Sequence, residues 1–202
     1  MKHILILLPL LVLSLFANDI TVEIGENPFF IKDSLEINYL YTDVVEETTS
    51  KMEIGLKYTE NLYSWLNINT TYGYQMSDTK YFTSSANNYG VGLELFYDFN
   101  KAIYLSYSTN LYYKSTTYTD TNGLELANND DIKYDNELSI YFATFKYIYN
   151  KVYFGISMQD EIGMYYGFST KYEYVKDFTF GFDIKVLTTN NTDFTITSGY
   201  IF

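Results

Sequence analysis

From Ser34 to Phe202, apolar and polar residues alternate with a period of two. Residues 89–99 show the pattern most clearly, because Tyr, Val, Leu or Phe stands at every second position and Gly, Glu, Phe or Asp stands between them. A period of two is that of a β-strand, whose successive side chains point to opposite faces. None of these segments has helical periodicity. The segments are about 10 residues long, which is close to what a tilted strand needs to cross a bilayer.

About ten such segments follow one another, and they predict an all-β fold with roughly ten antiparallel strands. Eight strands are the alternative if the first or the sixth segment is misjudged. The sixth loses its alternation at residues 144–146, which predicts a β-bulge. Longer polar connections alternate with short turns, and the longest connection is expected at Ser115 to Asp131, with a turn signal at 120–123. The short turns are expected at Glu60-Asn61, Asn100-Lys101, Asn150-Lys151 and Lys176-Asp177.

Proline and tyrosine usage agree with a closed sheet in a membrane. The only prolines are Pro9 and Pro28, so the predicted sheet contains none. A closed sheet has no place for a residue that lacks a backbone donor. The chain is 20% aromatic and has 24 tyrosines, which suit both a membrane interface and a polar lumen. Aromatics near the strand ends predict two membrane girdles, with an aromatic ligand groove as the alternative: Tyr41, Tyr74, Tyr89 and Tyr113 in one, and Tyr58, Phe99, Tyr174 and Phe178 in the other.

The last segment places Phe194, Ile196, Ser198, Tyr200 and Phe202 on one face, with an aromatic residue at the end. It resembles the closing strand of small bacterial outer-membrane β-barrel proteins. The resemblance implies a transmembrane antiparallel up-and-down β-barrel with both termini in the periplasm. It also implies that Tyr200 and Phe202 belong to the signal read by the barrel-insertion machinery, and that outer-membrane lipid and lipopolysaccharide surround the barrel.

The first residues predict export. Residues 1–17 begin with Lys2, continue with an apolar run from Ile4 to Leu13 and end at the small Ala17, the pattern of a cleaved signal peptide. A membrane anchor is the alternative, but the run is shorter than the roughly 20 residues that a spanning helix needs. We therefore expect a signal peptide over 1–17, a periplasmic tether, partial plug or disordered segment over 18–33, and the barrel over 34–202.

Charged residues recur on the face that is expected to line the lumen. Simple hairpin registers place Glu36 opposite Lys57 and Lys171 diagonal to Asp183, pairings that offset the cost of burying charge. One hypothesis is a polar network that fills the barrel, and the other is an ion-conducting lining. About ten strands enclose little more than side chains can fill, which favours the filled lumen. If a passage exists, the acidic excess predicts cation preference. The predicted lumen network comprises Glu36, Glu53, Lys57, Glu94, Asp98, Lys114, Glu137, Lys171, Glu173, Asp183 and Lys185.

The composition argues against catalysis. The chain has no Cys, and its one His is His3, inside the predicted signal peptide. The exported chain would thus lack both thiol and imidazole, so we expect no enzyme, no cofactor and no metal site. The run Asn128 to Asp131 with Asp135 has the oxygen ligands that calcium prefers, but a solvated loop is the simpler interpretation. The net charge of −12 argues against a nucleic-acid partner. A structural or surface-interaction barrel and a narrow channel both remain open, as does the oligomeric state.

Overall fold

The computed structural model describes residues 32–43, 50–78, 82–99, 103–120, 123–145, 147–159, 162–188 and 191–202. The expected signal peptide and nearly all of the segment 18–33 lie outside the described residues, so their roles stay predictions. Within the described ranges, no helix has the length and hydropathy of a membrane span.

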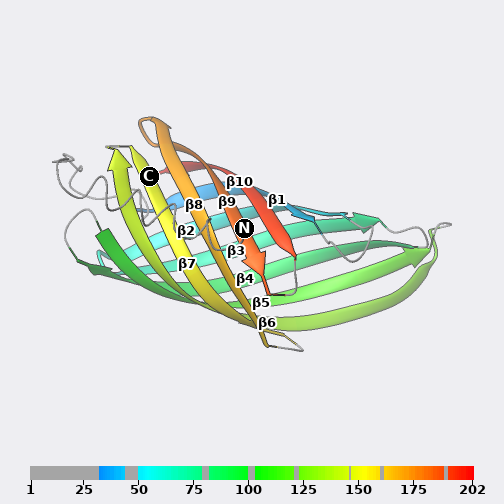
Figure 1. Cartoon of the computed structure of the whole chain (residues 1–202). Coiled ribbons are helices and arrows are strands. Elements are labelled where there is room, and N and C mark those ends of the chain that lie inside the picture. The colour runs from blue at the N-terminus through cyan, green and yellow to red at the C-terminus, as the bar shows by residue number, and fades with distance from the viewer. Residues whose placement is uncertain are drawn as a thin grey trace, which may run out of the picture.

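Ten strands close into one barrel (Figure 1), and each pairs antiparallel with its neighbours in the chain. The first strand pairs with the last through Ser34↔Ile201 to Asp43↔Thr192, which closes the sheet. This confirms the prediction of ten strands and rules out the alternative of eight. The strands are β1 (Ser34–Asp43), β2 (Ser50–Tyr63), β3 (Leu66–Asp78), β4 (Phe82–Asp98), β5 (Ile103–Asp120), β6 (Glu125–Phe145), β7 (Ile148–Met158), β8 (Ile162–Val175), β9 (Phe178–Leu187) and β10 (Thr192–Ile201).

The connections at the two ends of the barrel differ little in length. At one end, which we call the terminal end, β1 begins and β10 ends, and the connections after β2, β4, β6 and β8 are 2 to 4 residues long. The connections at the other end are 3 to 6 residues long, so the predicted contrast between short turns and long loops is weak. The turn at Lys176-Asp177 is confirmed, and Asp177 adopts a positive φ of 71° there. The turn predicted at Asn100-Lys101 falls outside the described residues, although the Phe99 N–H donates to the Ile103 carbonyl across it at 3.0 Å.

Two predicted turns at the terminal end are wrong. Strand β2 runs through Glu60-Asn61 and turns only at residues 64–65, and β7 already begins before Asn150. In both places an Asn that suggested a turn finds partners within the sheet. The Asn61 Nδ2 donates to Asn67 Oδ1 at 2.7 Å, and the Asn150 Nδ2 donates to Thr144 Oγ1 at 3.0 Å. The predicted bulge is confirmed, since the β6–β7 register shifts between Ala143 and Phe145.

The longest predicted loop, Ser115 to Asp131, is also wrong, because most of it is strand. Strands β5 and β6 stay paired from Lys114↔Asp131 to Thr119↔Glu125. The threonines of this segment are β-branched and favour extended backbone. Only the turn signal is confirmed: Gly123 has a φ of 84° and its N–H donates to the Asp120 carbonyl at 3.1 Å. Strands β4, β5 and β6 therefore project beyond the rest of the barrel, to the right in Figure 1.

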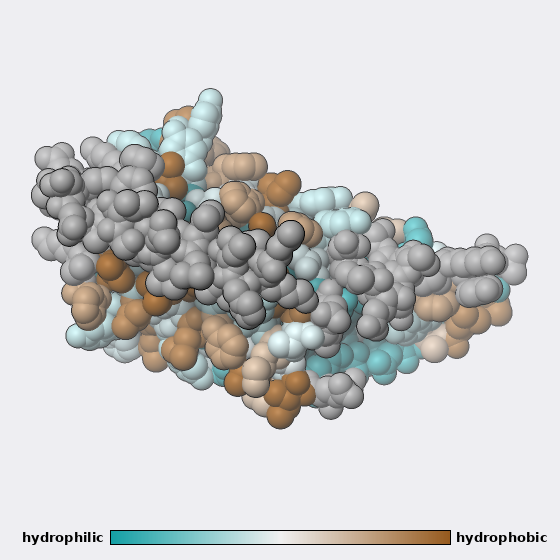
Figure 2. Space-filling model, viewed as in Figure 1, coloured by the Kyte–Doolittle hydropathy of each residue, from teal (hydrophilic) through white to brown (hydrophobic). Residues whose placement is uncertain are grey.

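The side chains are arranged with polar groups inside and apolar groups outside. On β4, Val91 and Leu93 are 54% and 45% exposed, whereas Glu94 between Leu93 and Leu95 is 8% exposed. Figure 2 shows brown, apolar residues spread over the outer wall. A wall of this kind is stable when lipid surrounds it, and the closed sheet leaves no strand edge unpaired within that lipid.

Aromatic side chains gather at two levels of this wall. Towards the far end, Tyr89 pairs with Tyr113 across β4 and β5, and its ring centroid lies 5.2 Å from that of Tyr72. At the terminal end, the rings of Phe178 and Tyr200 lie 4.9 Å apart, and Tyr200 in turn contacts Phe202. This distribution over two rims matches girdles and does not form a single aromatic groove.

Burial of the wall in lipid predicts the effect of a charge on it. Replacing Leu93 with Lys is expected to lower the free energy of unfolding in bilayers by about 2 kcal/mol, because the ammonium group would have to be placed in hydrocarbon. Leu126 is similarly exposed at 56%, but it lies on the projection of β6, beyond the level of Tyr113, so Leu126→Lys is the matched control and should have little effect. Urea unfolding in phospholipid vesicles measures both. Equal losses for the two variants would contradict the placement of the wall in lipid.

Candidate functional site in the barrel lumen

The predicted lumen charges lie on the inner face of the sheet, and one of them lies at its rim. Glu36 and Glu94 are each 8% exposed, and most of the others are half-buried among strands from all sides of the barrel. Asp98, the last residue of β4, is exposed at the terminal end.

One ion pair crosses the lumen from β8 to β1. Glu36 stands opposite Lys57 in the β1–β2 register, as expected from the hairpin. Lys171 is diagonal to Asp183, because its neighbour position Ser169 pairs with Asp183. The ion pair that Glu36 forms, however, is with Lys171, 135 residues away along the chain. Strands β1 and β8 are not neighbours in the sheet, so this contact ties two walls of the barrel together.

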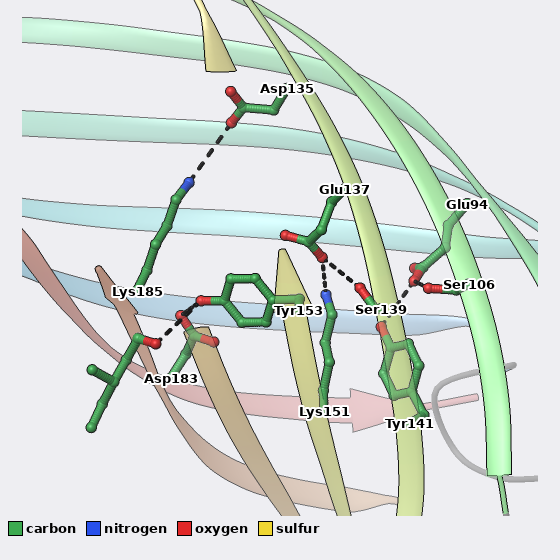
Figure 3. Close-up of polar contacts among 11 residues, drawn as sticks. Glu94, Ser106, Asp135, Glu137, Ser139, Tyr141, Lys151, Tyr153, Asp183 and Lys185 are labelled. Atoms are coloured by element: carbon green, nitrogen blue, oxygen red, sulfur yellow. Dashed lines mark hydrogen bonds and ion pairs between the residues drawn. The ribbon is translucent and has the colours of Figure 1, made fainter. Parts of the chain in front are cut away.

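Lys151 is the centre of a second group, shown in Figure 3. Its ammonium nitrogen lies 2.5 Å from Glu137 Oε1 and sits over the rings of Tyr141 and Tyr153, at 5.4 Å and 5.0 Å from their centroids. Glu137 also accepts a hydrogen bond from the Ser139 hydroxyl at 2.9 Å. An ammonium group with a carboxylate and two ring faces is well compensated for its burial.

The tyrosines extend this group to further carboxylates. The Tyr141 hydroxyl donates to Glu94 Oε1 at 2.9 Å, and the same oxygen accepts from the Ser106 hydroxyl at 2.9 Å. The Tyr153 hydroxyl donates to Asp183 Oδ2 at 2.8 Å. A connected polar group thus reaches from β4 to β9, and we call it the Lys151 cluster: Glu94, Glu137, Tyr141, Lys151, Tyr153 and Asp183.

A third group lies further from the terminal end, around Asp135. This carboxylate is 3.0 Å from the Lys133 ammonium and 3.9 Å from that of Lys185, which lies 3.7 Å from the centroid of the Tyr165 ring. Tyr165 is 2% exposed and makes an edge contact with Tyr153, with their centroids 6.1 Å apart. The Asp135 group therefore adjoins the Lys151 cluster through two tyrosine rings.

Single hydrogen bonds hold the remaining lumen charges nearer the far end. The Lys114 ammonium donates to Gln75 Oε1 at 2.8 Å, and the Asn88 amide donates to Glu53 Oε2 at 2.9 Å. Each contact joins strands that are two apart in the sheet. They add to the cross-links that span the interior.

Glycines on the inner face make room for the tyrosine rings. A Cβ placed on Gly155 would lie 2.2 Å from Tyr165 Cζ, and one placed on Gly167 would lie 2.3 Å from Tyr153 Cζ. These distances are far below van der Waals contact, so the hydroxyl end of each ring occupies space that a side chain at the glycine would need. Small and large side chains alternate across β7 and β8 in a way that fills the lumen.

A cavity of about 110 Å³ lies inside the described part of the barrel. It lies in the half of the lumen nearer the terminal end, between the Glu36–Lys171 pair and the Lys151 cluster. That volume accommodates several water molecules, and the polar walls can satisfy them. Its charged lining consists of Glu36, Lys57, Glu94, Lys151, Lys171 and Asp183.

Sequence reasoning missed several of these residues. Lys151 was expected in a turn, and Lys133 and Asp135 stood in or beside the expected loop. Tyr153 and Tyr165 had a recognisable signal, because each alternates with an inward-facing glycine on its strand. The run considered for calcium is divided by the structure, since Asn128 and Asp130 are exposed while Asp135 is buried against lysine. In the described residues, no three acidic side chains come together in a metal-binding group.

The comparisons with known proteins find similar structures but no similar sequence. No protein-family model matches the chain, and no curated protein matches it. The structure is similar to that of the NanC porin, with a TM-score of 0.49 and 11% identity over 83% of this chain and 100% of the porin. It is similar to Ail, the attachment invasion locus protein of Yersinia pestis, with a TM-score of 0.45 and 9% identity over 85% of this chain and 97% of Ail.

Likenesses this distant carry no argument about function, and the architecture rests on the chain's own topology. Ten antiparallel strands close in sequence order, with an apolar exterior and a charged, hydrogen-bonded interior. The chain is an antiparallel up-and-down β-barrel with the architecture of small bacterial outer-membrane β-barrel proteins.

Proposed function

We propose that the chain is an integral barrel of the bacterial outer membrane with a filled, non-conducting lumen, and that it serves a structural or surface-interaction role. The observation that carries the proposal is the Lys151 cluster, which joins β4, β6, β7 and β9 through ion-pair and tyrosine contacts. Buried charges that are paired in this way are costly to separate, so the cluster stays in place and blocks the lumen.

The Glu36–Lys171 pair and the Asp135 group support the same function. They lie on either side of the Lys151 cluster and link strands that are not neighbours in the sheet. An ion that passed along the barrel would have to break several charged contacts in succession. The cavity between these contacts then holds water as part of the fold.

The projection of β4, β5 and β6 supports a role at the cell surface. With the terminal end in the periplasm, as expected for an even number of strands, the projection points away from the cell. The outer-membrane partners remain lipid, lipopolysaccharide and the insertion machinery, with Tyr200 and Phe202 as the proposed insertion signal. The exported chain has no His and no Cys, which supports a non-enzymatic function.

Single-channel recording tests the closed lumen. The exported protein, purified and reconstituted in planar bilayers, is expected to give no stable current steps, because the Lys151 cluster blocks the interior. Heat-shift on an unheated gel confirms that the reconstituted barrel is folded. Stable steps from folded protein would overturn the filled lumen.

The cavity favours one second candidate, a narrow channel for ions. Its charged lining consists of three carboxylates, those of Glu36, Glu94 and Asp183, and three lysines. Because Lys151 adds to the lysines expected from the sequence, the acidic excess is smaller than predicted, and any cation preference would be modest. If steps appear, a reversal potential in a salt gradient would decide the selectivity.

A further inference from the structure

Two carboxylates in the wall of the lumen cavity are only half satisfied by hydrogen bonds from the described residues. Glu94 is 8% exposed, and its Oε1 accepts from both Tyr141 and Ser106 (Figure 3), so nothing in the described part donates to Oε2. Asp183 is similar, because Tyr153 donates to Oδ2 and no described group donates to Oδ1. Neither of these two oxygens is sealed from solvent. Since both residues line the cavity, each has an oxygen that a molecule inside it can reach.

A lysine in the same wall, Lys57, also lacks a partner among the described residues. It stands opposite Glu36 in the β1–β2 register, but Glu36 forms its ion pair with Lys171 from across the barrel. Within the described ranges, Lys57 forms no ion pair and donates no hydrogen bond. A partnerless ammonium group in the wall of a polar cavity can donate charge-assisted hydrogen bonds to an anionic group there.

The two groups that enclose the cavity differ in charge. Glu36 has two lysines beside it, Lys57 opposite and Lys171 in the ion pair, so this group has a surplus positive charge. The Lys151 cluster has three carboxylates for one lysine, so it has a surplus negative charge. Fixed charges attract a solute group of the opposite sign. One side of the cavity therefore suits an anionic group, and the other suits a cationic group.

We propose that the cavity binds a small zwitterion, a solute of the size of a free amino acid with one carboxylate and one ammonium group. The solute's carboxylate accepts from the Lys57 ammonium group, and its own ammonium group donates to Glu94 Oε2. Asp183 adds to the negative charge on that side. The cavity of 110 Å³ has room for about eight water-sized groups, and a small amino acid has about five to eight non-hydrogen atoms.

The lining of the cavity reaches the terminal end of the barrel. It includes Ser34, the first residue of β1, and Tyr149, the second residue of β7, and both strands begin at that end. With this end in the periplasm, a solute enters the cavity from the periplasm, and the Lys151 cluster stops it from passing further. The site thus binds the solute without transporting it. This goes beyond the proposed function, because a filled lumen needs only water in the cavity.

Three small molecules test whether the site recognises both charges. Glycine has a carboxylate and an ammonium group, acetate has only the carboxylate, and methylammonium has only the cationic group. Isothermal titration calorimetry at low salt, on the exported protein refolded in detergent micelles, should show glycine binding about tenfold more tightly than either of the others. If acetate or methylammonium bound as tightly as glycine, a single charged contact would explain the binding and the proposal would be wrong. Absence of saturable glycine binding would also overturn it.

Substitution of the partnerless lysine tests the anionic contact. Lys57→Met should weaken glycine binding about tenfold and leave methylammonium binding unchanged, because only the carboxylate contact is lost. Lys51→Met is the matched control: Lys51 lies on the same strand and the same face as Lys57 but does not line the cavity, so glycine binding should stay unchanged. The heat-shift on gels shows that both variants are folded. Equal glycine affinities of the two folded variants would overturn the proposal.

Binding and conduction are separate readouts. Stable current steps in planar bilayers would overturn the filled lumen without changing the preference for glycine. Failure of glycine to bind would overturn the zwitterion site and leave the absence of current steps unchanged. The two failures are therefore distinguishable.

Discussion

Replacing Lys151 with Ala is expected to lower the free energy of unfolding by about 3–5 kcal/mol, the range for removing one partner of a buried ion pair. Glu137 would lose the ammonium group at 2.5 Å and retain the Ser139 hydroxyl. Tyr141 and Tyr153 would lose the cation over their rings. Equilibrium urea unfolding in phospholipid vesicles, followed by tryptophan fluorescence or by the gel shift, measures the change.

Two further variants separate the ion pair from general effects of removing a lysine. Lys176→Ala removes an exposed lysine in the turn between β8 and β9, and its effect should stay within about 0.5 kcal/mol. Replacing both partners, Lys151→Met with Glu137→Leu, should recover much of the loss because no unpaired charge remains. A loss below about 1 kcal/mol for Lys151→Ala would contradict the central place of the Lys151 cluster.

Replacing Gly167 with Ala is expected to destabilise the barrel by about 3 kcal/mol, at the upper end of overpacking effects. The new Cβ would lie 2.3 Å from Tyr153 Cζ and 2.4 Å from the Ile184 carbonyl oxygen. The ring can rotate away only by breaking the Tyr153–Asp183 hydrogen bond, and the carbonyl belongs to the neighbouring strand. The refolding yield and the urea midpoint measure the effect.

Gly163 on the same strand is the matched control. A Cβ there would have the Ser157 carbonyl oxygen at 4.0 Å, which is ordinary contact. Gly163→Ala should therefore be neutral or slightly stabilising, because alanine restricts the unfolded chain more than glycine does. If Gly163→Ala and Gly167→Ala behaved alike, the packing of Tyr153 against bare backbone would be wrong.

The strand number and the faces could be predicted because they depend on local periodicity. Alternation such as that from Tyr89 to Phe99 fixes which side chains point inward, whatever the rest of the chain does. The predicted turn positions were wrong where the turn depends on contacts across the sheet. Asn61 and Asn150 have the propensity for a turn. Within the strands, however, their side-chain amides donate hydrogen bonds to Asn67 and Thr144. The threonines after Ser115 continued the strand where a polar loop was expected.

The contacts within the lumen could be predicted only between neighbouring strands. The hairpin rule placed Lys57 opposite Glu36, and the register agrees. It could not place Lys171, because that contact depends on how the sheet closes and on which side chain is long enough to cross it. The inward position of Lys151 was not predicted, for the same reason that the turn between β6 and β7 was misplaced. Because β7 begins at Ile148, before the expected turn at Asn150-Lys151, this lysine lies in the interior and not at the rim.

The central claim is that the chain forms a barrel in the outer membrane, with polar side chains inside and apolar side chains outside. Cell fractionation combined with a gel shift tests this claim most directly. Cells that express the full chain are separated into soluble, inner-membrane and outer-membrane fractions, and each fraction is run on gels with and without boiling. The account predicts that the protein is in the outer-membrane fraction and migrates faster before boiling than after it. A soluble periplasmic protein with no heat-dependent shift would contradict it.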